Sequence, residues 1–497
     1  MDRYALFSLT NKTDSEIVAK KLSNLGVKIL ASSGTGAYLK SKGINFVPVE
    51  SLTQFPESFN GRMKTLSFQI SSGILFNRNL ESDKSEASSL KVPQIDYVVC
   101  NLYDYNSVAG EAFDITEKIE KIDIGGPNMI RAAAKNFSSV TVLVDHNDYE
   151  QFIEDVELDN IDYRKKLAIK ALEYVNNYDR SIINDISSKK LRYGENPHQA
   201  ARLKKSSFKK GIADFKQLQG KQLSYNNYLD MNSAYLTCRS INSIKTTSNT
   251  SVVVKHTNPC GISSNTNALK SIEQAWNGDS VSAFGSIICT NYEINENVAS
   301  FFDDKFIEIL MAPKFTESAL LKLSSRKNLR LIQTEDIQIP KTISRNILGA
   351  ELIQDSDEIN EEDIDIVTEN KKLIEYNDLI QFGIHSCAQL KSNAITLVRQ
   401  TDGGCFVVGS GMGNPNRLVS IEQSIKKAQE NGVKDFSNVI LISDAFFPFD
   451  DAINLANEYG IKLIVQPGGS IKDNIVVNTC NSFDISMGLT GKRHFNH

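Results

Sequence analysis

Short, almost uninterrupted apolar runs alternate with helical patterns over the first 150 residues, and this alternation restricts the possible folds more than any other feature. The runs YALFSL, GVKILA, YVVCNLY and SVTVLVD are predicted strands, and segments such as DSEIVAKKLSNL are predicted helices. Strands that lack polar alternation are buried on both faces, which is typical of parallel sheets covered by helices. The sequence therefore predicts an α/β fold with a parallel sheet in this region.

A helical, charge-mixed segment at 160–186 is predicted to bridge this region to the rest of the chain. After it the alternation resumes, with predicted strands TSVVVKH, AFGSIIC, NAITLV, CFVVGSG, NVILISDAFF and IKLIVQPGG. We interpret the acidic stretch at 355–370 as a solvated crossing between two halves of the C-terminal region. No short-period repeat is evident. The predicted domains are residues 1–186, 187–354 and 355–497.

Composition argues against several classes of protein. The 55 basic and 60 acidic residues do not suit a general nucleic-acid coat. No apolar run is long enough to cross a bilayer, and the N-terminus lacks the pattern of a secretory signal, so we expect neither a membrane span nor a signal peptide. The seven cysteines are scattered without a C-x-x-C pair. This usage indicates a reducing cytoplasm, with no disulfide framework and no structural zinc.

Two predicted strand-to-helix junctions in the N-terminal region carry small and hydroxylated residues that suit an anion. Hydroxyl groups donate to phosphate oxygens, and the start of a helix adds free N–H groups. An ordinary helix cap with a flexible turn is the alternative. Because the carboxyl ends of parallel strands meet at one edge, the two junctions are expected to lie close together. The residues are Ser8, Thr10 and Lys12 at the first junction and Ser32, Gly34 and Thr35 at the second.

Four cations in the same region are also spaced to hold an anion. Arg62 and Lys64 alternate along NGRMKTLS, and on an extended chain they would point the same way. Arg131 and Lys135 lie four apart on a helix that a Gly-Gly-Pro sequence opens. Like charges at this spacing disfavour a helix, so an anion between them is an economical explanation, with independent solvation as the alternative. Asp123, just upstream, is placed to orient a lysine or a substrate amide.

The stretch VVVKHTNPCG ends a buried-type strand with Lys255 and His256 side by side. A neighbouring lysine lowers the pKa of a histidine by like-charge repulsion, which keeps the imidazole neutral as a base. Adjacent residues on a regular strand face opposite sides, so both reach one substrate only where the strand breaks. We expect TNPCG to supply that break. A structural histidine with its hydrogen bonds satisfied is the alternative.

Several polar stretches occur in an order that resembles the bifunctional AICAR transformylase/IMP cyclohydrolase family of purine biosynthesis. They are RYGENPHQ, LQGKQLSYNN, VKHTNPCG, VSAFGSI, KSNAI, SDAFFPF, QPGGSI and a terminal RHF-H, and together they run through essentially the whole chain. The resemblance implies an N-terminal cyclohydrolase domain related to methylglyoxal synthase. It also implies a transformylase of two cytidine-deaminase-like subdomains without zinc, and no H-x-E is paired with P-C-x-x-C here.

For the transformylase, the resemblance implies that a formyl group passes from 10-formyltetrahydrofolate, the cosubstrate, to the amine of AICAR. His256 would take the amine proton, and Lys255 would stabilise the oxyanion or protonate the leaving folate nitrogen. No metal is implied. Family positions on the nucleotide correspond to Arg192, Tyr193, Asn227, Asn393, Arg417 and Arg493, a position near the reacting groups to His497, and folate-side positions to Glu308, Phe449 and Asp451.

For the cyclohydrolase, the resemblance implies that the carboxamide nitrogen of formyl-AICAR attacks its own formyl group and water leaves, which gives IMP. Because the step is intramolecular, the protein mainly holds a near-attack geometry and stabilises an oxyanion. The matching catalytic positions are Lys64, Tyr103, Asp123 and Lys135. The phosphate and ribose cradle matches Ser8, Thr10, Lys12, Ser32, Gly34, Thr35, Arg62 and Thr65.

The chain also departs from the family pattern, because KTLSFQISSGIL stands where the family usually has KTLHPKVHGGIL, so two histidines near Lys64 are lost. The leading interpretation is the two-step enzyme. The alternatives are a transformylase whose N-terminal domain only binds nucleotide, and a catalytically silent nucleotide sensor. A methylglyoxal-synthase-like lyase would leave about 300 residues of transformylase motifs unexplained. The resemblance further implies a homodimer with transformylase sites at the subunit interface, small-molecule substrates, and no nucleic-acid or membrane partner.

Overall fold

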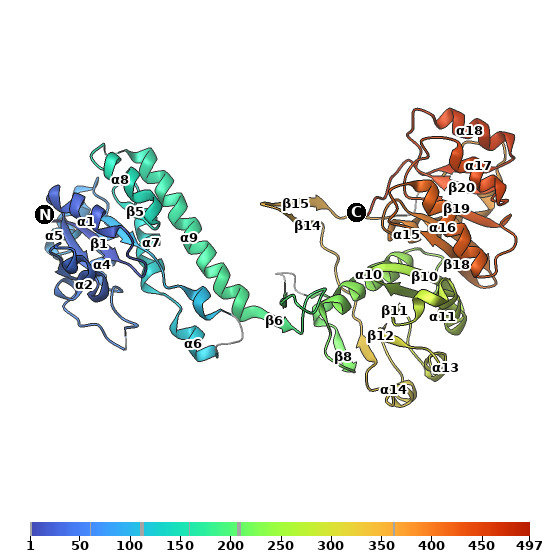
Figure 1. The fold of residues 1–497 in the computed structure, drawn as a ribbon, viewed down its shortest axis with the longest axis horizontal. Helices are drawn as coiled ribbons and strands as arrows, with labels where there is room; N and C mark the ends of the chain where they lie inside the picture. The colour runs from blue at the N-terminus through green and yellow to red at the C-terminus, as the bar shows by residue number, and fades with distance from the viewer. Residues whose placement is uncertain (1, 60, 110–113, 159, 206–209, 361–362) are drawn as a thin grey trace. The chain divides into compact units, whose positions relative to one another are not determined.

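The computed structural model describes residues 2–59, 61–109, 114–158, 160–205, 210–360 and 363–497. They divide into two compact units, Met1–Ser188 and Lys189–His497 (Figure 1). Each unit has its own central sheet and its own buried apolar clusters. No described helix is long and apolar enough to span a membrane.

The N-terminal unit contains a sheet in which every described strand pair is parallel, as the apolar runs predict. Leu6 on the central strand faces one core, and its neighbours Ala5 and Phe7 face another. The sheet is therefore buried on both faces. Its strands, in spatial order, are β3 (Val47–Pro48), β2 (Lys28–Ala31), β1 (Arg3–Ser8), β4 (Gln94–Cys100) and β5 (Thr141–Leu143).

Helices cover both faces of this sheet. The segment predicted at 160–186 forms the long helix α9 (Ile161–Ser187), and its residues Ala168, Ala171 and Val175 belong to the core of the N-terminal unit. This helix is therefore part of that unit's packing. The other helices are α1 (Ser15–Asn24), α2 (Ser33–Ser41), α3 (Val49–Thr53), α4 (Phe68–Leu75), α5 (Glu81–Ser89), α6 (Ile115–Glu120), α7 (Gly125–Lys135) and α8 (Tyr149–Asp155).

The C-terminal unit is organised around one mixed sheet, with twelve strands in the described part of the chain. Their spatial order is β16 (Asp365–Ile366), β21 (Ser486–Leu489), β20 (Leu463–Gln466), β19 (Val439–Ser443), β17 (Ile395–Thr401), β18 (Gly404–Gly411), β10 (Asn258–Asn265), β9 (Asn249–Lys255), β11 (Ser286–Thr290), β12 (Ile307–Ala312), β13 (Arg330–Gln333) and β8 (Lys216–Gln219).

This sheet consists of two halves with the same topology. In each half a helix precedes an antiparallel hairpin, the first hairpin strand pairs with an antiparallel third strand, and two further strands follow in parallel. The halves join where β10 pairs antiparallel with β18. This repeat lies in the order of elements, so it leaves no short-period repeat in the sequence.

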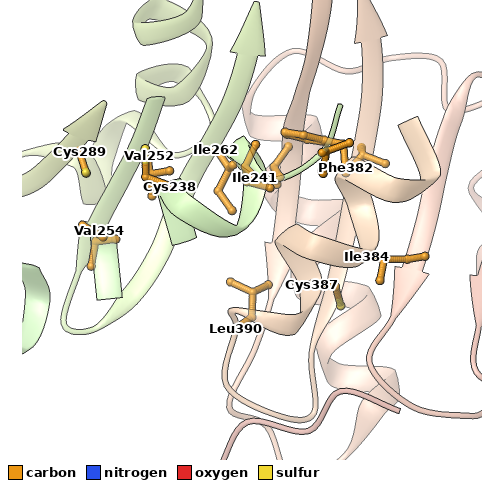
Figure 2. Close-up of a cluster of buried hydrophobic side chains, with 14 of the residues drawn as sticks. Cys238, Ile241, Val252, Val254, Ile262, Cys289, Phe382, Ile384, Cys387 and Leu390 are labelled. Carbon is orange, nitrogen blue, oxygen red and sulfur yellow. The ribbon is translucent and has the colours of Figure 1, made fainter. Parts of the chain in front are cut away.

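The leading helices of the two halves, α10 (Tyr225–Asn242) and α15 (Asn377–Ala388), lie over the junction and share one core. Figure 2 shows that Ile241 and Ile262 of the first half gather with Phe382 of the second half in this cluster. The two halves are therefore one packing unit. Their remaining helices are α11 (Ala268–Asn277), α12 (Ser280–Ala283), α13 (Glu296–Ser300), α14 (Glu317–Leu323), α16 (Arg417–Glu430), α17 (Asp451–Glu458) and α18 (Asp473–Ser482).

Two short hairpins lie outside the large sheet. One joins β6 (Ser188–Leu191) to β7 (Ala201–Lys204), and the other, β14 (Thr342–Ile347) with β15 (Ala350–Asp355), is exposed along its length. The acidic stretch follows this second hairpin. Its described carboxylate residues are exposed, but β16 joins the sheet and Thr368 is buried, so only part of the stretch is a solvated crossing. Residues 361–362 of the stretch lie outside the described residues.

Candidate active sites

The carboxyl ends of strands β1, β2 and β4 border a cavity of about 510 Å³ in the N-terminal unit. This is the edge at which parallel α/β sheets bind ligands. The lining brings together most of the residues predicted for this region. They are Ser8, Thr10, Ser32, Gly34, Thr35, Arg62, Lys64, Thr65, Tyr103 and Asp123.

Helices α2 and α7 both begin at this cavity. Ser32 is the N-cap of α2, and Gly34 and Thr35 lie in its first turn, so the helix cap of the alternative interpretation is present and its flexible turn is not. The Thr35 hydroxyl is buried and accepts a hydrogen bond from the Leu9 backbone N–H at 3.0 Å, which fixes the first junction against the second. Apart from its chain neighbours and the backbone of α2, no heavy atom of the described residues lies within 4 Å of the position that a Cβ would take on Gly34. Free N–H groups and open space at a helix N-terminus suit a phosphate.

The Gly-Gly sequence that opens α7 permits close packing at the cavity wall. A Cβ on Gly125 would lie 2.6 Å from the Thr65 hydroxyl oxygen, and one on Gly126 would lie 2.7 Å from Asp123 Oδ2. Both distances are shorter than a side chain tolerates. The glycines therefore let the start of α7 approach Thr65 and Asp123.

An ammonium group and a carboxyl group with shifted pKa values line the same cavity. The pKa of Lys64 is raised, first by its hydrogen bond to Glu57, whose Oε1 is 2.9 Å from Lys64 Nζ. Burial raises the pKa of Asp123, although the N–H groups of Gly126 at 2.8 Å and Tyr103 at 3.4 Å donate to it and oppose this rise. Lys64 is therefore held as a cation, and Asp123 is fixed by two backbone donors.

The segment that carries Arg62 and Lys64 is a turn, so the prediction of an extended chain is wrong. A bridge between Ser58 and Met63 closes the segment on itself. Arg62 consequently pairs with Glu120, whereas Lys64 pairs with Glu57. Both cations still line the cavity.

The structure does not bring three predicted residues into the described lining: Lys12, Arg131 and Lys135. Lys12 lies beside the cavity and its Nζ donates to the Thr10 carbonyl oxygen at 3.2 Å. Arg131 and Lys135 are exposed on α7, which runs away from its start at the cavity. Lys135 is its last residue, about 15 Å along the axis from Gly125 at the usual rise per residue.

Asn101, which no predicted site includes, also lines the cavity. Its Oδ1 accepts from the Thr10 N–H at 2.7 Å, and its Nδ2 donates to the Asn11 carbonyl oxygen at 2.7 Å. Asn101 therefore holds the first junction in place. Its position directly after the buried strand β4 was a readable signal.

In the C-terminal unit, Lys255 and His256 lie at the tip of the β9–β10 hairpin. Lys255 pairs with Asn258, so the turn is His256–Thr257, and both turn residues have positive φ, 55° and 63°. The strand breaks at His256–Thr257, so the predicted break includes Thr257 of TNPCG, but Pro259 and Gly261 do not end the ladder, because residues 259–261 continue in β10 through a register irregularity. Two-residue turns of this type normally use Asn-Gly, and a left-handed β-branched residue costs about 1–2 kcal/mol.

Helix α10 holds this strained turn at two points. The Thr257 N–H donates to Asp230 Oδ1 at 2.6 Å, and the Ser233 hydroxyl donates to the Thr257 carbonyl oxygen at 2.6 Å. Burial raises the pKa of Asp230, and the Thr257 N–H and the nearby His256 oppose that rise. Lys255 Nζ donates to the Phe284 carbonyl oxygen at 2.7 Å, while His256 is exposed. The tip thus presents the imidazole to solvent from a fixed backbone.

Other predicted residues of the first half lie near this tip. Asn227 completes the capping box that Ser224 begins at the start of α10, and its Nδ2 donates to Glu308 Oε2 at 3.2 Å. Glu308 stands near the start of β12 and lies close enough to Asp230 to influence its pKa. Asn226 Nδ2 donates to the Glu195 carbonyl oxygen at 3.3 Å, which ties the RYGENP loop to α10. The guanidinium of Arg192 in that loop lies 4.8 Å from the Tyr193 ring centre.

In the second half, Arg417 and Asn393 form one network with a buried carboxylate. Arg417 Nη2 donates to Asn393 Oδ1 at 2.7 Å, and Nη1 pairs with Asp444, which is only 4% exposed. Ser443 also accepts from Arg417, at 3.0 Å. The burial of Asp444 is a tertiary feature that its place after β19 does not reveal.

The C-terminal tail is anchored beside this network. The His497 carbonyl oxygen accepts from Lys391 Nζ at 3.0 Å and from Arg345 Nη2 at 2.6 Å. Arg493 is exposed, with its guanidinium 4.3 Å from the Phe495 ring centre. The terminal residues are therefore ordered by contacts, which explains why a usually frayed segment carries candidate residues.

Strand register places the candidate residues of both halves at one edge of the large sheet. The end of β18 and the end of β19 both pair with Ile395 at the start of β17. Because β18 and β10 are antiparallel, the end of β18 lies at the same edge as the start of β10, next to Lys255. Phe449 and Asp451 follow the end of β19, and Lys472 Nζ lies 4.0 Å from the Phe449 ring centre.

The described residues contain no group of three potential ligands that could hold a metal ion.

Comparison with known proteins identifies the family. The AICARFT/IMPCHase bienzyme family matches residues 133–427, and the MGS-like domain family matches residues 16–128. The bifunctional purine biosynthesis protein PurH of Prochlorococcus marinus is 40% identical, with 100% of both chains covered. The chain belongs to the AICARFT/IMPCHase bienzyme family.

Two further relatives of this bienzyme family carry the same name. The PurH proteins of Staphylococcus epidermidis and Acetivibrio thermocellus are each 38% identical, over 99% and 100% of both chains. A crystal structure of ForH, 31% identical, aligns with 37% of this chain and 96% of its own at a TM-score of 0.34, too low to bear on the fold. The MGS-like match confirms the predicted class of the N-terminal domain.

Within this bienzyme, the sequence departures near Lys64 fall mainly on helix α4. Ser67 is its N-cap and accepts from the Ile70 N–H at 3.1 Å, and Ser72 lies inside the helix. The described lining of the cavity includes Thr65 and Leu66 and none of the residues 67–72. The departures therefore lie on a helix next to the cavity and outside its described lining.

Proposed function

We propose that this protein catalyses two consecutive steps of purine synthesis. Formyl transfer from 10-formyltetrahydrofolate to AICAR is followed by dehydrative ring closure of formyl-AICAR to IMP. We assign ring closure to residues 1–186, and formyl transfer to two cytidine-deaminase-like subdomains at 187–354 and 355–497. No metal takes part in either proposed step.

The observation that carries the proposal is the convergence of Lys255, His256, Asn393 and Arg417 on one edge of the large sheet. These residues are far apart in sequence and come from both halves. A base, a cation and fixed nucleotide-binding groups at one edge form the set that formyl transfer needs.

In the proposed transfer, His256 acts as the base. Its side chain is exposed at a turn whose backbone α10 holds, so the imidazole is available to the weakly nucleophilic AICAR amine. Lys255 carries an ammonium group from the adjacent position and stabilises the oxyanion or protonates the departing folate nitrogen. Phe449 is half exposed and offers a flat apolar face for the pterin, with Asp451 and Glu308 as acceptors for its donors.

In the proposed ring closure, the N-terminal cavity holds the nucleotide in a near-attack geometry. The starts of α2 and α7 supply N–H groups for anionic oxygens, and Arg62 adds charge. Lys64 stabilises the oxyanion that forms on the formyl carbon, while Tyr103 and Asp123 orient the carboxamide. The proposal uses Lys64, Tyr103 and Asp123 rather than Lys135, which lies outside the described cavity lining.

We further propose that the enzyme works as a homodimer in a reducing cytoplasm. All seven cysteines are free, and six of them are buried, which suits a reducing compartment. Net charge and the absence of a membrane-spanning helix among the described residues are consistent with small-molecule substrates.

A split assay tests the proposal. The purified protein receives AICAR and 10-formyltetrahydrofolate, and tetrahydrofolate release and IMP formation are followed separately. Release of both products supports the two-step enzyme. Tetrahydrofolate release with accumulation of formyl-AICAR would instead support a transformylase with an inactive N-terminal domain, and binding of nucleotide without either product would support a sensor.

A further inference from the structure

Glu57 lies directly behind Lys64 and belongs to none of the residue sets described for the two reactions. Its Oε1 is 2.9 Å from Lys64 Nζ, and its Oε2 accepts a hydrogen bond from the Ser33 hydroxyl at 3.0 Å. Ser33 is the first residue of α2, whose start lines the cavity. One carboxylate therefore connects the cavity cation to the helix that offers N–H groups to the nucleotide.

The backbone around this ion pair is arranged to fit it. The Ser58–Met63 bridge sets Glu57 and Lys64 opposite each other across a tight turn. Gly61 in that turn has a φ of 90°, and a Cβ there would lie 2.9 Å from both Glu57 Oε1 and Lys64 Cε. The positive φ favours glycine at this position, and a side chain there would displace the ends of both partners of the pair.

Glu57 is absent from the described cavity lining, whereas Lys64 is part of it. The carboxylate thus reaches the cavity only through its partners. We propose that Glu57 is a positioning residue for ring closure, which holds Lys64 as a fixed cation and links it through Ser33 to the nucleotide-binding start of α2. This inference rests on the proposed cyclohydrolase function.

Removal of the Glu57 carboxylate is expected to change the pKa of Lys64, because charged neighbours set that pKa. Glu57 makes the largest contribution to the raised pKa of Lys64, the neighbouring Tyr103 and Asp123 raise it further, and burial opposes them. Without the Glu57 carboxylate the pKa of Lys64 falls, and the amine loses its proton at a lower pH. A reaction that needs the ammonium group then declines at a lower pH.

The test is Glu57→Gln in the full-length protein, with Glu81→Gln as the matched control. Glu81 also lies near a lysine in this unit, with Oε1 2.8 Å from Lys84 Nζ, but this pair is exposed on α5. With supplied formyl-AICAR, Glu57→Gln is expected to lower kcat by about 10-fold to 100-fold with little change in KM. The alkaline limb of its pH–rate profile is expected to move to lower pH, whereas Glu81→Gln leaves both quantities unchanged.

A double variant separates positioning from folding. Glu57→Gln added to Lys64→Met is expected to cause no further loss of ring closure, because its effect passes through the lysine. Equal, independent losses in the two backgrounds, or an unshifted pH profile for Glu57→Gln, would overturn the inference. Failure of the wild-type protein to close the ring would overturn the proposed function itself. Thermal unfolding followed by circular dichroism, with the transition of the N-terminal unit unchanged from wild type, verifies that each variant is folded.

Discussion

The two halves of the C-terminal unit share one topology, yet they bring opposite ends of their strands to the candidate transformylase site. The first half contributes the turn after β9, where Lys255 and His256 stand. The second half contributes the start of the corresponding strand β17, near Asn393, and the end of β19. The antiparallel β10–β18 junction turns one half by about 180° relative to the other in the plane of the sheet. One fold thus supplies two different sets of groups to one edge.

The hairpins of the two halves also differ in their turn residues. The β17–β18 hairpin, at the opposite edge, turns at Asp402–Gly403, and Gly403 has a φ of 79°. Asp-Gly is a favoured turn pair, whereas His256–Thr257 places two non-glycine residues at positive φ. Strain of this kind persists only where surrounding contacts hold it, and it is common at functional sites. Here α10 supplies those contacts.

The largest expected effect comes from removing the base on the strained hairpin. His256→Ala is expected to reduce formyl transfer by on the order of 10²–10⁴-fold. Ring closure of supplied formyl-AICAR should be unchanged, because the cavity lies in the other unit. Tetrahydrofolate release and IMP formation measure the two activities, with Asp402→Ala in the matching hairpin as the control. Loss of both activities in a folded His256→Ala variant would refute separate sites.

The second prediction concerns the contribution of the Arg417–Asp444 pair, in the second half, to the stability of the C-terminal unit. Arg417→Ala leaves the buried Asp444 carboxylate without its cation, which is expected to lower the unfolding free energy by about 3–5 kcal/mol. Trp276, the single tryptophan, is 8% exposed in the C-terminal unit, so its fluorescence during urea unfolding reports on that unit. Arg399→Ala, at an exposed position on β17, is the control. A loss below about 1 kcal/mol would show that the Arg417–Asp444 pair is not structurally important.

Placing glycine in the strained turn and alanine in the Asp-Gly turn tests whether the two turns differ in backbone strain. Thr257→Gly relieves the positive φ and is expected to stabilise the C-terminal unit by roughly 0.5–1 kcal/mol after the entropy cost of glycine. Gly403→Ala is expected to destabilise it by about 1–2 kcal/mol. A Cβ at 403 would also lie 2.5 Å from the Thr266 hydroxyl oxygen. Unfolding midpoints followed through Trp276 decide the signs, and changes of the same sign would show that the turns do not differ in strain.

The smallest expected effect is a pH dependence from Asp230. Burial raises its pKa above the ordinary value of 3.8, so its stabilising contribution is present at low pH and is lost as pH rises through the raised pKa. Asn at this position stays neutral and retains an oxygen for the Thr257 N–H. Asp230→Asn should therefore gain stability over wild type between about pH 4 and about pH 7. Asp402→Asn, at an exposed position, should give the same difference at both pH values.

The sequence predicted the N-terminal cavity more completely than the transformylase edge. Ser8 ends β1, Thr10 lies two residues beyond it and Ser32 directly follows β2, and parallel strands bring such positions to one edge. Arg131 and Lys135 were placed by spacing on one helix face, but spacing does not reveal that α7 starts at the cavity and leads away from it. Glu57 carried no motif, since its role depends on the turn that sets it opposite Lys64.

The sequence by itself determined the α/β class, the parallel sheet of the N-terminal unit, the family and most of the residues around its cavity. These follow from local patterns, because apolar runs, helix starts and ordered motifs are properties of neighbouring residues. Tertiary structure alone decided the turn at His256–Thr257, the buried Arg417–Asp444 pair and the shared edge of the two halves. Each depends on contacts between segments far apart in the chain: α10 with the hairpin tip, the start of α16 with the end of β19, and β10 with β18.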